Sequence, residues 1–87
     1  MPEICRFYGI VIAMFGDEHP LPHLHAKHGG DRAVFELRSG EMTEGWIPAR
    51  SAKLVKRWIS MHRDELLEMW DGLQGEYKSA WKIAPLD

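Results

Sequence analysis

The chain has 87 residues, 45% of them hydrophobic, and a formal net charge of −2, so we expect one domain over residues 1–87 with a single modest core. Its scattered basic residues exclude an overall electrostatic attraction to nucleic acid, although a local basic patch remains compatible with this composition. The lone Cys5 excludes an internal disulfide and a cysteine-based zinc cage, and it fits a reducing cytoplasm.

The first part of the chain, residues 3–47, is predicted to be strand-rich. Residues 4–15 are rich in β-branched and aromatic side chains, and Gly9 predicts a bend or bulge within them. Their apolar run is too short to span a bilayer, and the start of the chain does not resemble a signal peptide. We therefore expect a cytoplasmic protein without membrane contact.

The pair Gly29-Gly30 predicts a tight hairpin turn, and two prolines delay the start of the preceding strand to about residue 22. In the tightest register Leu24 lies opposite Phe35 on one apolar face of the sheet. The other face then carries three cross-strand pairs: His23 with Glu36, His25 with Val34, and Lys27 with Arg32. The last pair sets two like charges opposite each other, which counts mildly against this register.

A second turn at Ser39-Gly40 leads to the last predicted strand, which ends near residue 47. The alternation of side chains places Thr43 on the histidine side of the sheet, with Met42 and Trp46 on the apolar side. Glu44 would share the apolar side, so this strand needs an edge position or a β-bulge.

Pro48 fits the first turn of a helix that is predicted over about residues 49–73. Its apolar residues recur at three- and four-residue steps: Val55, Ile59, His62, Leu66, Met69 and Leu73. At about 1.5 Å per residue the helix would be roughly 39 Å long, whereas a four-stranded sheet is roughly 15–20 Å wide. One end should therefore overhang the sheet, or the helix should break near His62-Arg63.

The C-terminal tail, residues 76–87, could return over residues 80–86 as an edge strand. The predicted fold class is therefore α+β, an antiparallel meander sheet of about four strands with one long C-terminal amphipathic helix packed on one face. In this arrangement the sheet separates His62 from His23 and His25.

The segment 18–28 holds four of the five histidines, and it is where we expect the functional site. One interpretation is a metal site in which His19, His23 and His25 bind zinc. Residues two apart on a strand project to the same face, and three imidazoles would leave one coordination position open.

A second interpretation is metal-independent cleavage of RNA, with His23 and His25 as acid and base and Glu36 orienting His23. Lys27 or Arg38 would then stabilise the charge that develops on the phosphorane. The plainest alternative is that both histidines are solvent-face residues that hydrogen-bond their polar neighbours. Composition and spacing do not choose among the three.

The most specific pattern in the chain is His-x-x-Pro-His-x-His, which contains His19, His23 and His25. Together with residues 6–12, 47–50, 58–70 and 82–86, it resembles the small prokaryotic domain of unknown function 4160 family. Family members usually carry Pro-Pro-His-Phe-His in this pattern. This chain has Leu21 and Leu24 at the two changed positions, and all three histidines are intact.

The resemblance implies a short cytoplasmic protein that is often encoded beside a second small domain of unknown function, as in a toxin–antitoxin module. It implies no established reaction. We therefore expect a partner-binding component of a two-gene toxin–antitoxin-like module, with the histidines in its functional site and a small protein encoded by an adjacent gene as partner. Leu67 and Trp81 are the expected partner contacts.

Two alternatives remain open at this point. The domain could be a ribonuclease-type toxin that binds RNA, or a histidine-based metal-binding domain. The sequence therefore leaves undecided whether the protein is an enzyme.

Overall fold

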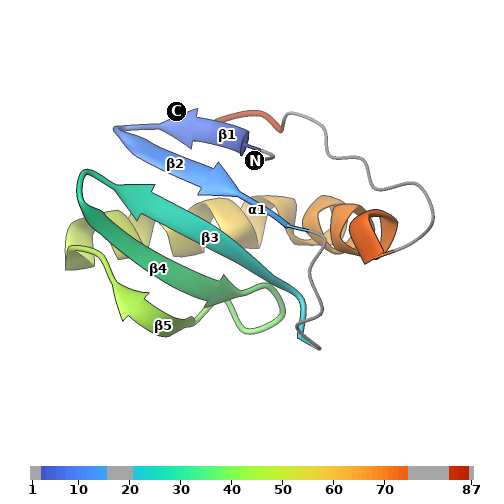
Figure 1. The fold of residues 1–87 in the computed structure, drawn as a ribbon. Helices are drawn as coiled ribbons and strands as arrows, with labels where there is room; N and C mark the ends of the chain where they lie inside the picture. The colour runs from blue at the N-terminus through green and yellow to red at the C-terminus, as the bar shows by residue number, and fades with distance from the viewer. Residues whose placement is uncertain (1–2, 16–20, 75–82, 87) are drawn as a thin grey trace.

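The computed structural model describes residues 3–15, 21–74 and 83–86. Within these ranges the strands and the helix are β1 (Glu3–Phe7), β2 (Ile10–Ala13), β3 (His23–His28), β4 (Asp31–Glu36), β5 (Met42–Trp46) and α1 (Ala49–Gln74). The strands form one antiparallel sheet in chain order, and α1 runs along one face of it (Figure 1). This is the predicted α+β meander, with five strands instead of about four.

The additional strand arises because residues 4–15 form a hairpin and not one continuous strand. Tyr8 and Gly9 are the two central residues of its turn, with φ of 48° and 77°. Two-residue hairpin loops favour turns with positive φ, since their twist matches that of the strands. Asparagine or glycine usually occupies the first of these positions. Because tyrosine rarely adopts positive φ, the sequence at Tyr8 did not predict this two-residue turn.

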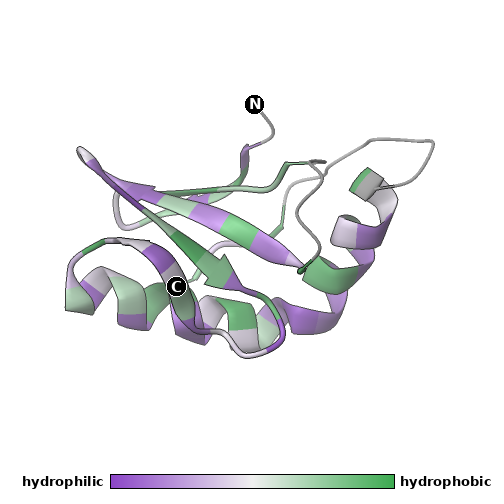
Figure 2. Cartoon of the chain, turned by 60° about the horizontal axis from the view of Figure 1, so that its bottom comes forward, coloured by the Kyte–Doolittle hydropathy of each residue, from purple (hydrophilic) through white to green (hydrophobic). Residues whose placement is uncertain are grey.

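The predicted register of the β3–β4 hairpin is confirmed at every position, including the like-charged pair of Lys27 and Arg32. Leu24 and Phe35 are fully buried between the sheet and α1. Hydrophobic and hydrophilic residues alternate along the strands, as Figure 2 shows. One face of the sheet is therefore the core, and the other face carries the polar side chains.

Strand β5 differs from the prediction by one residue. Met42 pairs with Phe35 but Glu44 pairs with Val34, so Thr43 is the extra residue of a β-bulge. The bulge keeps Met42 on the core side and moves Glu44 and Trp46 to the histidine side, where Trp46 is 59% exposed. The predicted place of Trp46 on the apolar side is therefore wrong. The edge position and the β-bulge, of which this strand was expected to need one, are both present.

The backbone after the bulge approaches β4 very closely. Gly45 has a φ of +72°, and a Cβ atom at this position would overlap the carbonyl oxygen of Arg32. Only glycine fits this conformation and this space without displacing backbone. The bulge thus depends on Gly45.

The predicted helix and its buried face are confirmed. Its buried side chains include Val55, Ile59, Leu66, Met69 and Leu73, whereas Lys53, Lys56, Arg57, Ser60, Asp64, Glu68 and Asp71 are exposed. The helix is kinked at His62, whose φ of −122° and ψ of 18° are not helical, and it extends past the sheet (Figure 1). Both expected consequences of its length therefore occur. The His62 ring is partly exposed, with its Nδ1 atom 3.8 Å from a carboxylate oxygen of Glu65.

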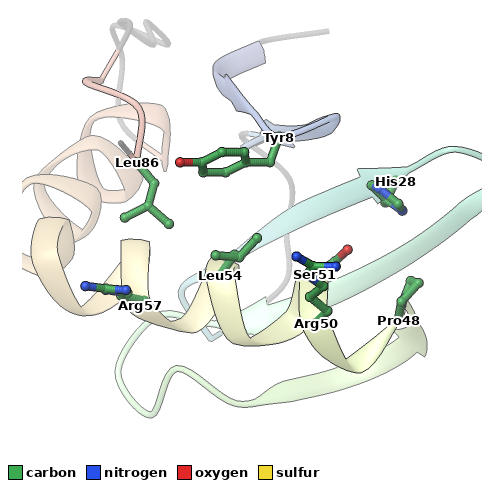
Figure 3. A pocket seen from close by; sticks show the side chains of 8 residues that line it. All are labelled: Tyr8, His28, Pro48, Arg50, Ser51, Leu54, Arg57 and Leu86. Atoms are coloured by element: carbon green, nitrogen blue, oxygen red, sulfur yellow. The ribbon is translucent and has the colours of Figure 1, made fainter.

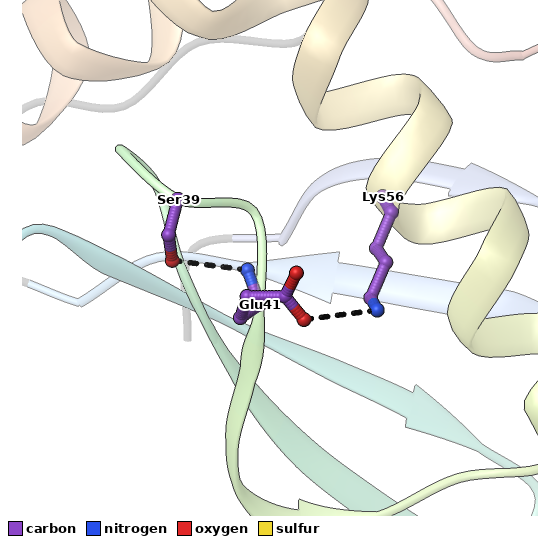
Figure 4. Close-up of polar contacts among 3 residues, drawn as sticks. All are labelled: Ser39, Glu41 and Lys56. Atoms are coloured by element: carbon purple, nitrogen blue, oxygen red, sulfur yellow. Dashed lines mark hydrogen bonds and ion pairs between the residues drawn. The ribbon is translucent and has the colours of Figure 1, made fainter.

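Two side chains of α1 hold the turn between β4 and β5. The Nε atom of Arg63 donates a hydrogen bond to the carbonyl oxygen of Leu37 over 3.0 Å. Lys56 forms an ion pair of 3.0 Å with Glu41, and Ser39 accepts a hydrogen bond from the Glu41 amide (Figure 4). The Arg63 contact is partly buried and the Lys56 pair is exposed, so the Arg63 contact contributes more to stability.

Residues 83–86 lie beside the outer edge of β1 but do not form a strand. The amide of Ile83 donates to the carbonyl oxygen of Ile4, and the indole nitrogen of Trp58 donates to that of Ala84 over 2.8 Å. The edge strand predicted over residues 80–86 is therefore not seen in its described part, and residues 80–82 lie outside the described ranges. Among the described residues, no helix is both long and apolar enough to cross a membrane.

The buried face of α1 yields a stability prediction. Ile59→Ala and Leu66→Ala should each lower the free energy of unfolding by about 2–5 kcal/mol, because each leaves a cavity under the sheet. Lys53→Ala and Asp64→Ala change exposed side chains on the opposite face and should be nearly silent. Urea denaturation of the four variants measures the difference. Equal midpoints for the two pairs would contradict the assigned face.

Candidate functional site on the open sheet face

The sheet face that points away from α1 carries His23 and His25. Of the described elements only α1 covers the sheet, and it packs on the other face (Figure 2). Three rows of paired residues cross this open face: Val11, Lys27, Arg32 and Trp46; then Ala13, His25, Val34 and Glu44; then His23 and Glu36. We refer to these ten residues as the open face.

His23 lies at the start of β3 and is only 4% exposed. Its Nδ1 atom is 2.8 Å from the carbonyl oxygen of Leu21, and its ring centroid is 4.9 Å from that of Trp70. A carbonyl oxygen can only accept, so in the neutral ring the proton is on Nδ1 and the lone pair is on Nε2. The overhanging end of α1 therefore reaches this histidine, and the expectation of a solvent-face His23 is wrong.

His25 is the central histidine of the open face. It is partly buried, its ring meets Phe15 edge-on at 4.8 Å, and its centroid is 5.2 Å from that of His23. It borders two hollows, one of about 150 Å³ toward Phe15 on the β2 side and one beside Glu44 on the β5 side. The two histidines thus form an adjacent pair, as the two-residue spacing predicts.

The other predicted site residues are less close to this pair. Glu36 faces His23 by register, but in the described part of the chain its carboxylate has no hydrogen bond or ion pair, and Nδ1 of His23 bonds Leu21. Arg38 is exposed in the turn after β4, without a described contact to the histidines. Leu67 is half-buried and packs against the core, and its role as a partner contact stays a prediction. His19 and Trp81 lie outside the described residues.

The predicted zinc site stays a prediction. Within residues 3–15, 21–74 and 83–86, no three His, Cys, Asp or Glu side chains are grouped so that they could hold a metal ion. His23 and His25 would provide two imidazole ligands, and the third ligand of the predicted set, His19, is not among the described residues. Two imidazoles alone do not make the three- or four-ligand zinc sites of proteins.

The cations of the sheet differ in their partners. Arg6 is on β1, two strands from the histidines. It donates to Glu3 over 2.9 Å, and this hydrogen bond and the attraction between the charges raise the pKa of its guanidinium. Lys27 and Arg32 face each other, and among the described residues neither has an ion-pair partner. Like charges directly opposite each other destabilise a sheet, so this pair is a local cost to folding.

Trp46 and Arg32 are the residues of this face that the sequence did not identify as site candidates. In the predicted register Arg32 had no role except to repel Lys27 on the opposite strand. Trp46 was assigned to the core because the bulge at Thr43 was not placed. The position of Arg32 or Trp46 in a predicted strand does not by itself distinguish a binding residue from a structural one. The distinction needs the exposure of each side chain in the folded structure.

A family model described as Domain of unknown function (DUF4160) matches residues 9–71. The chain belongs to this family. The match covers most of this DUF4160 chain, including β2 to β5 and all three residues of the histidine pattern. No curated protein and no solved structure matches the chain.

The like-charged pair gives a prediction about stability. Lys27→Glu replaces a repulsive cross-strand pair with an attractive one, so it should raise the free energy of unfolding by about 0.5–1 kcal/mol. Lys27→Gln removes only the repulsion and should lie between this variant and the wild type. Thermal unfolding at low and high salt measures the order, and salt should compress it. A Lys27→Glu variant that is less stable than Lys27→Gln would contradict the assignment.

Proposed function

We propose that this domain is the partner-binding component of a two-gene toxin–antitoxin-like module, and that it binds a small protein on its open face. The observation that carries the proposal is Trp46, which is 59% exposed and lies opposite Arg32 at the β5 end of that face. The family's tandem gene arrangement supplies the class of partner.

The chemistry of this row suits a protein interface. Tryptophan and arginine are the residues that most often dominate binding energy, because a large ring buries much area and a guanidinium makes several hydrogen bonds. Lys27 and Arg32 bring two positive charges without described ion-pair partners. A partner that places carboxylates against them would relieve their repulsion, so we expect an acidic contact surface on the partner.

The edge of the sheet supports the same surface. β5 is the last strand of the sheet, and no described strand pairs with its outer side, whereas residues 83–86 lie along the β1 edge. An open edge offers backbone donors and acceptors to an added strand. The bulge at Thr43 interrupts this edge, so an added strand would pair beside Glu44 and Trp46, next to the side chains of the open face.

Co-purification with the product of the adjacent gene tests the proposal. Wild-type protein should hold its partner at micromolar concentration, where a dissociation constant near 1 μM corresponds to about −8.2 kcal/mol. Trp46→Ala and Lys27→Glu should each weaken the complex at least about tenfold, as truncation of an interface hot spot does. Met61→Ala is the matched control, because Met61 is 60% exposed but lies on α1.

Two outcomes would contradict the proposal. The first is separate elution of the two proteins at micromolar concentration. The second is a complex that tolerates Trp46→Ala as well as it tolerates Met61→Ala. Because Lys27→Glu should also stabilise the fold, loss of binding in that variant could not be attributed to unfolding.

A second candidate function is cleavage of RNA, and the adjacency of the histidine pair favours it. Two imidazoles whose ring centroids are 5.2 Å apart can serve as base and acid for a 2′-hydroxyl attack on phosphate. Lys27 lies in the neighbouring row, where a cation could stabilise the phosphorane. This reaction needs no metal ion.

Expression in a bacterial host tests this candidate. If the domain is a ribonuclease, the wild type should slow growth and degrade RNA, and His25→Ala should restore both. His25→Ala is cleaner than a His23 variant, because His23 is buried against Trp70 and its truncation would also disturb packing. Normal growth and intact RNA in the wild-type strain would exclude the ribonuclease.

A further inference from the structure

A groove of about 590 Å³ lies on the side of the sheet that faces α1, which is the side opposite to the open face. It lies between the β1–β2 turn, the end of β3 and the first half of α1 (Figure 3). Its described polar lining consists of Tyr8, His28, Arg50, Ser51 and Arg57, and none of the described residues that line it carries a carboxylate. Pockets of 300–1,000 Å³ are the usual size for small ligands.

The arginines of the groove have no ion-pair partner within the described part of the chain. Neither Arg50 nor Arg57 forms a hydrogen bond or ion pair with any described residue, in contrast to Arg6 and Arg63. The nearest carboxylate by register is Asp31, which pairs with His28 at the end of the hairpin and does not line the groove. The groove is therefore a local concentration of positive charge in a chain whose net charge is −2.

The start of α1 adds backbone donors to this charge. The first helical hydrogen bond runs from the Ala52 amide to the Pro48 carbonyl, so the amides of residues 49–51 precede the helical ladder. Pro48 has no side chain that could cap them, and the first turn contains no acidic residue. These amides and the helix dipole favour an anion at this end of α1.

Ser51 is the independent observation that points to a ligand. It lies on the buried stripe of α1, four residues before Val55, so its side chain points toward the sheet. It is only 7% exposed, it lines the groove, and its hydroxyl has no hydrogen bond to a described residue. No fully buried side-chain oxygen among the described residues lacks a partner, so the Ser51 hydroxyl oxygen keeps some accessible surface, and Ser51 lines the groove. A hydroxyl of a nearly buried residue, at the lining of a groove and in the uncapped first turn of a helix, suits an anion's oxygen atom.

Tyr8 provides a flat surface at the rim. It is 59% exposed and keeps a φ of 48°, a conformation that bulky residues rarely adopt. Strain of this kind is common where a side chain serves binding. The ring stands at the upper side of the groove, and the side chains of Leu54 and Leu86 lie below and beside it (Figure 3). The groove thus joins a cationic, donor-rich part to an aromatic and apolar part.

We propose that this groove binds a phosphate monoester of nucleotide size. The phosphate would lie at the start of α1 and accept hydrogen bonds from Ser51, the free amides and the arginine forks, which match phosphate geometry. The aromatic base would lie against Tyr8 and the leucines. The shared chemistry is a terminal phosphate, which a free nucleotide or the 5′ end of an RNA could supply. The proposal is independent of the partner interface, which is on the other face of the sheet.

Calorimetric titration of the full chain tests the site with defined probes. Adenosine 5′-monophosphate should bind at least about tenfold more tightly than adenosine, and inorganic phosphate should compete with it. Added salt should weaken binding, because the groove is cationic. A short RNA with a 5′-phosphate should be compared with the same RNA carrying a 5′-hydroxyl. A preference for the phosphorylated RNA over the free nucleotide identifies an RNA end as the source, and the reverse order identifies a nucleotide.

Variants locate the binding. Arg57→Gln and Ser51→Ala should each weaken adenosine 5′-monophosphate at least about fivefold. Lys53→Gln removes the same charge from the same helix but is outside the groove, so it should leave the affinity within about twofold. Circular dichroism and the melting temperature verify that the variants are folded.

The proposal is overturned if no phosphate-bearing probe binds at millimolar concentration. It is equally overturned if adenosine and its monophosphate bind alike, or if Arg57→Gln and Lys53→Gln have the same effect. None of these three outcomes would bear on the partner interface, because the adjacent-gene test uses Trp46 and Lys27. Failure of the partner interface would likewise leave this site intact.

Discussion

The pairing of β3 with β4 is the constraint on which the rest of the structure depends. Side chains alternate with a period of two along a strand, so a slip of one residue would exchange the two faces of the sheet. Burial of Leu24 against Phe35 prevents that slip, because the alternative would place histidines and charges under α1. The same pairing forces Lys27 opposite Arg32. The free energy gained by burying Leu24 and Phe35 therefore outweighs the repulsion between the two like charges.

Much of this fold could be predicted from the sequence, for reasons that differ by element. The buried face of α1 could be predicted because a 26-residue helix repeats its apolar pattern many times, and its excess length predicted an overhang or a break near His62. Two features could be predicted only in outline, as a bend or bulge at Gly9 and as an edge position or β-bulge in the strand that contains Glu44. The turn at Tyr8 uses a residue that rarely accepts positive φ, and the bulge at Thr43 depends on a backbone contact of Gly45. Both are decided by tertiary context and not by local preference.

The candidate sites were harder to foresee than the fold. The adjacency of His23 and His25 follows from their spacing, but the cover over His23 comes from Trp70, forty-seven positions along the chain. The groove beside Ser51 joins the first hairpin, the third strand and the helix start, which no sequence window contains. Within the ranges that the structure describes, cations without an ion-pair partner thus lie on two opposite faces, although the chain as a whole is slightly acidic.

The kink at His62 has a consequence for how the molecule opens. Each half of α1 has about the length at which isolated helices are marginal, roughly 12–15 residues, so the second half persists because it docks on the core. Such a unit can detach at a lower free energy than global unfolding and would exchange its amide hydrogens earlier. Trp70 belongs to that half and contacts the His23 ring. Detachment of the second half of α1 would therefore remove Trp70 from the His23 ring. It would expose His23 on the α1 side of the sheet, although His23 belongs by register to the open face.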